Sequence, residues 1–382
     1  MKKIYWRPSG VSRSILLILA LFSVGGVASV EVFKSTFQQR MYKEKIRAAR
    51  QMGKAIQHLA KERIKISGPL DLDSDPAQSG VIGILMSDIT STSGHLESKQ
   101  TTINPNWAAV MIEYFRRAKL KAGDQVAVGF SGSFPALNLA TVIAAETYGL
   151  KLLVTTGVTA SQWGANVPEF TWLDIERILI EARIIKTKTL AASLGGQGDR
   201  AHGLSSKGIQ LIKRAMLRNN VPFIEAKTPE ESMNSRMKIY EEAAGEEEIK
   251  AYVNVGGNTV SVGSIIGKKL YREGINLKPS ANALSVDCVM SRFARNGLPV
   301  IHMIRINKLA ERYGLPLSPK FLPRVGEGKI FVKEEYNLYL VVAVLSLILI
   351  ALYIFMKSDL GFRIMYTAEE SKSAAQPPSP MV

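Results

Sequence analysis

Short apolar runs alternate with longer amphipathic stretches through the middle of the chain, between two uncharged segments near its ends. The apolar runs are bounded by turn-forming residues and predict strands. These runs are Val81–Met86, Gln125–Phe130, Lys151–Thr156, Thr187–Leu194, Val221–Glu225, Ile249–Val255 and Pro299–Ile304. The stretches between them have helical periodicity. They are Asn106–Leu120, Pro135–Tyr148, Thr171–Ile185, Ser205–Asn219, Pro229–Ala244 and Gly263–Glu273.

This alternation is typical of parallel strands joined by crossover helices. It predicts an α/β domain over 67–335, built on a layered and mostly parallel sheet, with a candidate sub-boundary near 229–256. Two helix starts support the assignment. Thr171 and Asp174 have the spacing of a capping box, and Thr228 is followed by proline at the first helical position.

The two uncharged segments predict transmembrane helices on either side of this domain. Ser14–Val30 lies between Arg13 and Glu31, and it follows a basic head at 1–13. It predicts an anchor over 14–33, at the short end of what spans a bilayer. The alternative is a cleavable signal peptide, processed near Val27-Ala28-Ser29. Tyr336–Met356 is uncharged for 21 residues and predicts a second span. The Pro- and Ser-rich tail at 357–382 predicts disorder.

Two spans place both chain ends on one side of a cell membrane and the domain on the other. The Lys and Arg residues that flank the spans on the domain side favour a cytoplasmic domain. The basic head before the first span favours the opposite orientation, and long domains translocate largely regardless of charge. We therefore expect an extracytoplasmic domain.

Half of the net charge is concentrated in one strip. The whole chain of 382 residues carries +16, and Lys34–Lys65 alone holds ten basic and two acidic residues. Met41, Ala48, Met52, Ala55, Ile56 and Leu59 recur there with helical spacing. The strip at 34–66 therefore predicts a basic amphipathic stalk helix. It would lie on anionic membrane lipid, pair with a partner helix, or serve as a solvated spacer.

Composition excludes several classes of function. Ile66–Tyr336 holds 32 basic and 27 acidic residues, so the domain has no dense basic patch for nucleic acid. One cysteine, Cys288, rules out a disulfide framework and Cys-rich metal sites. The acidic run Asp71–Asp75 lacks the glycine and closing glutamate of a calcium loop. We predict no metal and no cofactor.

Five loops that follow predicted strands are rich in Gly, Ser, Thr and Asn. In an open parallel sheet, ligands bind beyond the carboxyl ends of the strands. The loops therefore predict a shared ligand-binding edge, although surface loops also need polar residues and glycine in order to turn. The candidate ligand-binding residues are Ser87, Asp88, Ser131, Gly132, Ser133, Asn138, Gly157, Ser161, Asn166, Gly195, Gly196, Gly257 and Asn258.

The loop after the second predicted strand, Gly129–Ser133 followed by Pro135, allows three interpretations. It can hold an anion at a helix N-terminus, because free N–H groups and the helix dipole favour negative charge there. Ser133 can simply cap the helix. The loop also approximates a nucleophile elbow, with Ser131 as nucleophile and a catalytic triad completed by His202 and Asp199, or by Asp174 in place of Asp199. No Gly-Lys-Ser/Thr follows, so it is not a Walker A loop.

The order of these pieces resembles the membrane-associated poly-gamma-glutamate system protein family. The resemblance rests on the basic-headed anchor, on the stretches Gly129–Asn138 and Thr156–Asn166, and on Val255-Gly256-Gly257-Asn258. It implies a part in making, exporting or trimming an anionic γ-linked glutamate polymer at a bacterial membrane, and it assigns no catalytic residue.

Three hypotheses follow from the resemblance and the residues together. The first is a membrane-anchored accessory protein of poly-γ-glutamate biosynthesis or export in capsule formation. Its domain would bind the polymer, a glutamyl precursor or synthase subunits. The second is a serine hydrolase or transferase that acts on γ-glutamyl amide bonds. The third is a non-catalytic scaffold of a membrane synthase complex.

Overall fold

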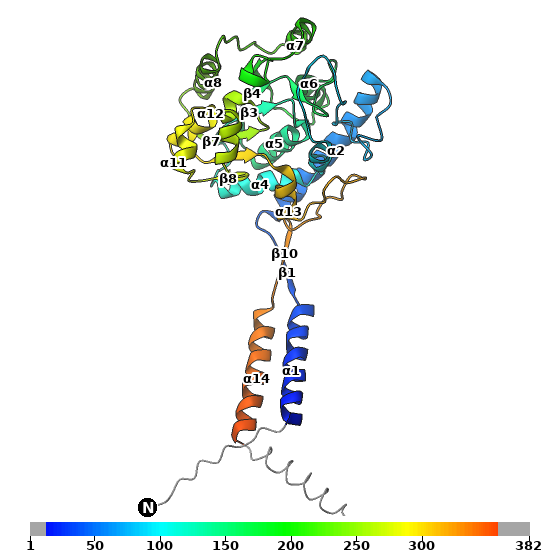
Figure 1. Ribbon diagram of the computed structural model, residues 1–382, viewed down its shortest axis with the longest axis vertical. Coiled ribbons are helices and arrows are strands. Elements are labelled where there is room, and N and C mark those ends of the chain that lie inside the picture. Colours follow the sequence, from blue (N-terminus) through cyan, green and yellow to red (C-terminus); the bar gives the residue numbers. More distant parts are fainter. Residues whose placement is uncertain (1–12, 358–382) are drawn as a thin grey trace, which may run out of the picture. The chain divides into compact units, whose positions relative to one another are not determined.

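The computed structural model describes residues 13–357, which separate into two compact units (Figure 1). The first unit is formed by the ends of the described chain, up to Phe37 and from Val332. The second spans Gln38–Phe331 and contains the α/β domain. Residues 1–12 of the basic head and 358–382 of the tail lie outside the described residues.

The first unit is a pair of helices and a pair of short strands. α1 (Arg13–Val32) and α14 (Leu338–Lys357) lie side by side (Figure 1). Strand β1 (Ser35–Gln38) pairs with β10 (Val332–Glu335). The two predicted apolar segments therefore form helices. None of the helices, over the residues that the structure describes, meets the combined length and apolarity needed to cross a membrane.

The second unit is built on a six-stranded sheet in the order β6-β4-β3-β7-β9-β8. All neighbouring strands are parallel except the edge pair β8 and β9. The register aligns Val128 of β3 with Val154 of β4 and with Val253 of β7. The strands are β3 (Gln125–Ser131), β4 (Lys151–Gly157), β6 (Thr189–Ser193), β7 (Ile249–Val255), β8 (Gly274–Asn276) and β9 (Val300–Met303). A mixed α/β fold with a mostly parallel sheet is confirmed.

Helices cover both faces of this sheet, and side chains of the strands alternate between the two cores. Val126 and Val128 of β3 belong to one core, whereas Ala127 belongs to the other. The first core is covered by α2 (Tyr42–Ser67), α4 (Trp107–Arg117), α5 (Pro135–Tyr148), α6 (Trp172–Glu181), α7 (Ser206–Arg218) and α13 (Ile306–Tyr313).

The opposite face carries helices from the C-terminal half of the domain (Figure 1). They are α8 (Pro229–Ala244), α9 (Thr259–Val262), α11 (Ala281–Ser285) and α12 (Val289–Arg295), with α10 (Ser264–Leu270) following α9. Three smaller elements contribute to the loops. α3 (Leu96–Thr102) precedes α4, the turn η1 (Gln197–Asp199) follows β6, and the short strands β2 (Thr90–Thr92) and β5 (Ala160–Ser161) pair in parallel.

The predicted stalk is a core helix of the domain. α2 buries Ala48, Met52, Ala55 and Leu59, and it packs against α4 and α5. The apolar spacing therefore predicted the helix and its buried face, but the assignment of 34–66 as a separate stalk is wrong. The core of the domain itself covers the apolar face. The basic residues of α2 do not reveal this burial in the sequence. Most of them occupy the opposite face, and Lys45 is buried in an ion pair with Glu113.

Two predicted strands are absent from the sheet. Val81–Met86 has no neighbouring strand; the side chain of Asn166 bonds both the N–H and the carbonyl oxygen of Ile84. Val221–Glu225 makes only an isolated bridge between Phe223 and Ala192. Apolar runs predict extended backbone, but a strand also needs a partner along its length.

Candidate functional site

The sheet has a point at which its strand order reverses. From β3 the chain moves outward to β4 and then β6, and it returns on the other side of β3 to form β7 and β9. In open α/β sheets the crevice at such a reversal, beyond the carboxyl ends of the strands, is the usual ligand site. Here the reversal lies between β3, which ends at Ser131, and β7, which ends at Val255 and is followed by Gly256.

The five predicted loops meet at this edge. A Cβ on Gly256 would lie 3.0 Å from Cβ of Ser131, and one on Gly157 would lie 2.7 Å from Nδ2 of Asn258. On the fourth loop, a Cβ on Gly195 would lie 3.1 Å from Cα of Gly157, and one on Gly196 would lie 3.3 Å from Cβ of Ser91. The turns that the sequence singled out therefore share one rim, which we call the carboxyl-edge rim.

Lys99, a residue that sequence reasoning did not select, lies buried where two of these loops meet. Its Nζ donates a hydrogen bond to the carbonyl oxygen of Ser133 and one of 2.8 Å to Oγ of Ser161. The same Nζ lies 3.7 Å from the centroid of the Phe134 ring, within cation–π range. Within residues 13–357 no carboxylate pairs with it, and burial lowers the pKa of Lys99 to about 7. A buried lysine with a lowered pKa can bind an anionic ligand, or it can accept a proton as a general base.

A second lysine lies on the other side of the strand reversal. The side chain of Lys268, from α10, lies so close to Gly257 that a Cβ at Gly257 would collide with its Nζ. Burial lowers the pKa of Lys268, and among the described residues it has no hydrogen-bond or ion-pair partner. Gly256, next in the chain, lies against both Ser131 and the Phe134 ring. The rim thus holds two lysines that have no carboxylate partner among the described residues, Lys99 against Ser133 and Lys268 against Gly257.

Ser133 does not cap α5, which was one interpretation of the sequence. Phe134 is the N-cap position of α5, and no side chain caps it. The hydroxyl oxygen of Ser133 instead accepts the backbone N–H of Ser161 at 3.0 Å, so the prediction that Ser133 caps the helix is wrong. Oγ of Ser131 accepts the backbone N–H of Ser133, and Asn138 donates to the carbonyl oxygen of Ser131. The two loops are thereby locked to each other, because Gly132 also donates to the carbonyl oxygen of Gly157.

Asp199, within the fourth loop, is held in a buried network. It pairs with Arg236 at 3.0 Å, both side chains being almost fully buried, and it accepts hydrogen bonds from Ser193, Ser232 and Asn258. These contacts use its carboxylate to fasten α8 and the loop after β7 to the rim. Asp199 therefore has a structural role.

The proposed triad is not assembled by hydrogen bonds. His202 is exposed, and across the described part of the chain no hydrogen bond joins it to Ser131 or Asp199. The alternative acid, Asp174, completes the predicted capping box with Thr171 and pairs with Arg218. The capping box is confirmed, whereas no base contacts Ser131 among the residues that the structure describes.

The side chains of the first predicted loop mainly contact other parts of the domain. The hydroxyl of Ser87 donates to the carbonyl oxygen of Asn166, and Asn166 in turn donates to Thr90. Asp88 forms an exposed ion pair with Lys207 at 2.8 Å. These three candidate residues are therefore engaged with the protein itself.

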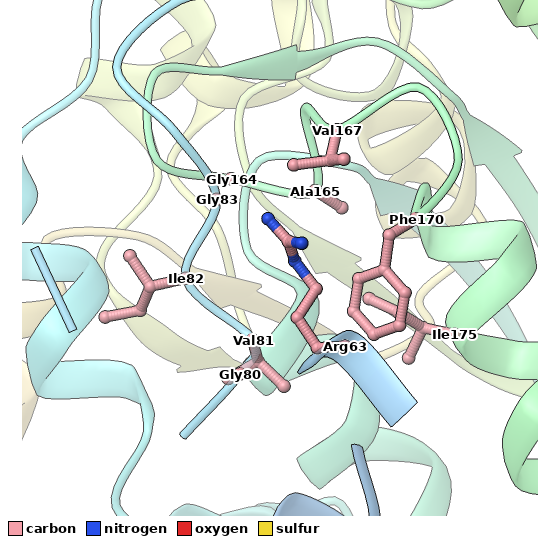
Figure 2. Close-up of a pocket in the computed structure, with 10 residues that line it drawn as sticks. All are labelled: Arg63, Gly80, Val81, Ile82, Gly83, Gly164, Ala165, Val167, Phe170 and Ile175. Atoms are coloured by element: carbon pink, nitrogen blue, oxygen red, sulfur yellow. The ribbon is translucent and has the colours of Figure 1, made fainter. Parts of the chain in front are cut away.

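A hollow beside the rim contains an arginine but has no space for a ligand (Figure 2). Arg63 points from α2 towards Gly83, Gly164 and Val167, and its guanidinium lies 5.6 Å from the Phe170 ring centroid. The hollow holds about 160 Å³ of empty space, none of it wide enough for a water molecule. A roomier hollow, with about 620 Å³ of empty space by the same measure, is lined by Glu176 and Lys188 away from the rim.

Comparison with known protein families, with curated proteins and with solved structures finds no match to this chain.

Proposed function

We propose that this chain is a membrane-anchored accessory protein of poly-γ-glutamate biosynthesis or export, and that its α/β domain binds the anionic glutamyl polymer or its precursor at the carboxyl-edge rim. The polymer is named by the resemblance carried by Gly129–Asn138, Thr156–Asn166 and Val255–Asn258. These stretches meet at the strand reversal, so one ligand would contact all three.

The observation that carries the proposal is a pair of lysines at the rim. Lys99 lies against Ser133 and Lys268 lies against Gly257, and neither has a carboxylate partner among the described residues. Removing an ammonium group from water is unfavourable unless an opposite charge or hydrogen bonds compensate. A ligand carboxylate would supply that charge. The α5 dipole would add a smaller attraction, because α5 presents its positive end at the same place.

The anchoring part of the proposal rests on the two end segments. Ser14–Val30 and Tyr336–Met356 are free of charged residues, and α1 and α14 leave large apolar side chains exposed. Leu21, Val24, Leu345 and Leu349 are each more than half exposed. Continuous apolar surface of this kind indicates contact with lipid or with other membrane proteins, such as synthase subunits.

The test is polymer binding by the full-length chain in detergent micelles. We expect Lys268→Met to weaken binding of poly-γ-glutamate by about tenfold, which corresponds to about 1.4 kcal/mol. Lys269→Met is the matched control, because Lys269 is the next residue of α10 and is exposed. Binding should also weaken with added salt. Equal affinity of wild type, Lys268→Met and Lys269→Met would contradict the proposed site, and no binding by wild type would contradict the function.

A further inference from the structure

Lys99 and Ser161 have the geometry of a base and a nucleophile. Nζ of Lys99 lies 2.8 Å from Oγ of Ser161, and the carbonyl oxygen of Ser133 fixes the position of that Nζ. The Ser133 hydroxyl accepts the backbone N–H of Ser161 at 3.0 Å and positions the second residue. A nucleophile within hydrogen-bond reach of a base that a third group orients is the common arrangement of covalent catalysis.

We propose that Ser161 is an acyl-accepting nucleophile and Lys99 is its general base, so that the carboxyl-edge rim transfers or hydrolyses an acyl group. The substrate class, an amide between glutamyl units, rests on the proposed function. The reaction at Ser161 does not. Water or an amine is the second substrate.

The surroundings of Lys99 suit this role. A lysine is a base only when it is neutral, and burial without a carboxylate partner lowers the pKa of Lys99 to about 7. About half of the molecules would then carry a neutral amine near neutral pH. The ring of Phe134 covers the amine and shields it from bulk water.

The steps balance with these two side chains and water. Oγ of Ser161 attacks the carbonyl carbon while its proton moves to Nζ of Lys99. The carbon–nitrogen bond then breaks, the leaving nitrogen takes that proton, and the acyl group remains as an ester on Ser161. Water attacks the ester and Lys99 accepts one proton of the water. That proton passes to Oγ as the acyl–oxygen bond breaks, and the product leaves as a carboxylic acid that releases its own proton to solvent. An amine in place of water gives transfer instead of hydrolysis.

Ser161 fits the role better than the neighbouring serines. The hydroxyl of Ser131 interacts with the backbone N–H of Ser133, and no base contacts it within residues 13–357. The hydroxyl of Ser133 is turned towards the N–H of Ser161. Ser161 is 6% exposed and lies in the two-residue strand β5, so the reagents that test it have to be small.

The first experiment treats the full-length chain with a short-chain alkyl fluorophosphonate and locates the adduct by peptide mass spectrometry. We expect an adduct on Ser161 that forms faster as pH rises through about 7, the pKa of Lys99. Lys99→Met should slow it at least a hundredfold, and Ser285→Ala, at an exposed serine of α11, should not. An adduct on another serine, or none at all on folded protein, overturns the proposal.

The second experiment keeps the proposal testable if Lys99→Met alters folding. Ser161→Cys, with Lys99 present, should react with iodoacetamide at pH 7 at least tenfold faster than Ser161→Cys with Lys99→Met, because a neighbouring ammonium lowers a thiol pKa. Buried Cys288, whose pKa is raised by burial, serves as the internal reference in every digest, and its alkylation reports unfolding. Equal rates at residue 161 with Cys288 protected overturn the dyad. Neither experiment uses the polymer, so either can fail while polymer binding holds.

Discussion

Asp199 is a buried charge with structural contacts, although the sequence also made it a candidate catalytic residue. Its carboxylate is the only described ion-pair partner of buried Arg236. Replacing Asp199 with Ala leaves that guanidinium without a counter-ion, and breaking a buried pair in this way costs about 3–5 kcal/mol. We expect Asp199→Ala to lower the free energy of unfolding by that amount, measured by denaturant titration.

The matched control is Asp88→Ala. Asp88 pairs with Lys207 at 2.8 Å, but both side chains are well exposed. Exposed pairs contribute about 0–1 kcal/mol. If Asp199→Ala proves as stable as Asp88→Ala, the carboxylate is not structural, and its predicted part in a triad with His202 becomes the better explanation.

Glu176 predicts a pH dependence of stability. It is buried and accepts hydrogen bonds from the N–H and hydroxyl of Thr189, and burial raises the pKa of Glu176 from 4.5 to about 7. The raised value means that the folded state favours the protonated carboxyl. The stabilising contribution is therefore complete below pH 4.5 and is lost as pH rises to about 7. A shift of this size corresponds to roughly 3 kcal/mol.

Glu176→Gln tests this dependence, because glutamine keeps the shape without the titration. We expect the variant to lose most of the decline in unfolding free energy between pH 4.5 and 7, and to be at least as stable as wild type at pH 8. The measurement is denaturant titration across that range. Parallel pH profiles for the two proteins would show that Glu176 keeps its ordinary pKa.

Single residues also show where sequence reasoning reached its limit. Ser131, Ser133 and Ser161 were selected because they follow strands, and the register of parallel strands brings such positions together. Lys99 and Lys268 were missed, because a lysine on a short helix is usually solvated. The burial of Lys99 depends on a loop more than thirty residues away in the sequence. The burial of Lys268 depends on Gly257 in the preceding loop. The local hydrophobic periodicity therefore does not predict that either lysine is buried.

The burial of helix α2 was also not predictable from its sequence. Its apolar spacing predicted a helix, but a sequence cannot say whether a partner, a lipid surface or the protein's own core covers an apolar face. Because Met52 is fully buried against the domain core, Met52→Ala should cost about 2–5 kcal/mol. Arg50→Ala, at an exposed position of the same helix, should change stability by less than about 0.5 kcal/mol.

Thermal or denaturant unfolding of the full chain measures both α2 variants. If Met52→Ala unfolds with the same free energy as Arg50→Ala, α2 is a solvated spacer as the strip at 34–66 first suggested.

The strands of the central sheet were easier to predict. Buried parallel strands such as β3 and β7 are continuous apolar runs bounded by turns, and they pair along most of their length.

The whole molecule is defined by a domain whose two chain ends both lead into apolar helices. If α1 and α14 are embedded in a cell membrane as proposed, both ends of the chain lie on one face of that membrane and Gln38–Phe331 on the other. If the domain is extracytoplasmic, as the sequence analysis predicts, it would meet a polymer that leaves the cell. The charges beside the two apolar segments favour opposite orientations, and a labelling experiment decides between them.

Cysteine labelling in intact cells measures it, because native Cys288 is buried and gives a low background. We expect Arg50→Cys, at an exposed position of α2, to react with a membrane-impermeant maleimide in intact cells. Ser371→Cys, beyond the second apolar segment, should react only after permeabilisation. The reverse pattern places the domain in the cytoplasm, where the rim would meet a precursor before export. Labelling of both positions in intact cells would mean that the two segments do not cross the membrane as a pair, and the proposed anchoring would fail.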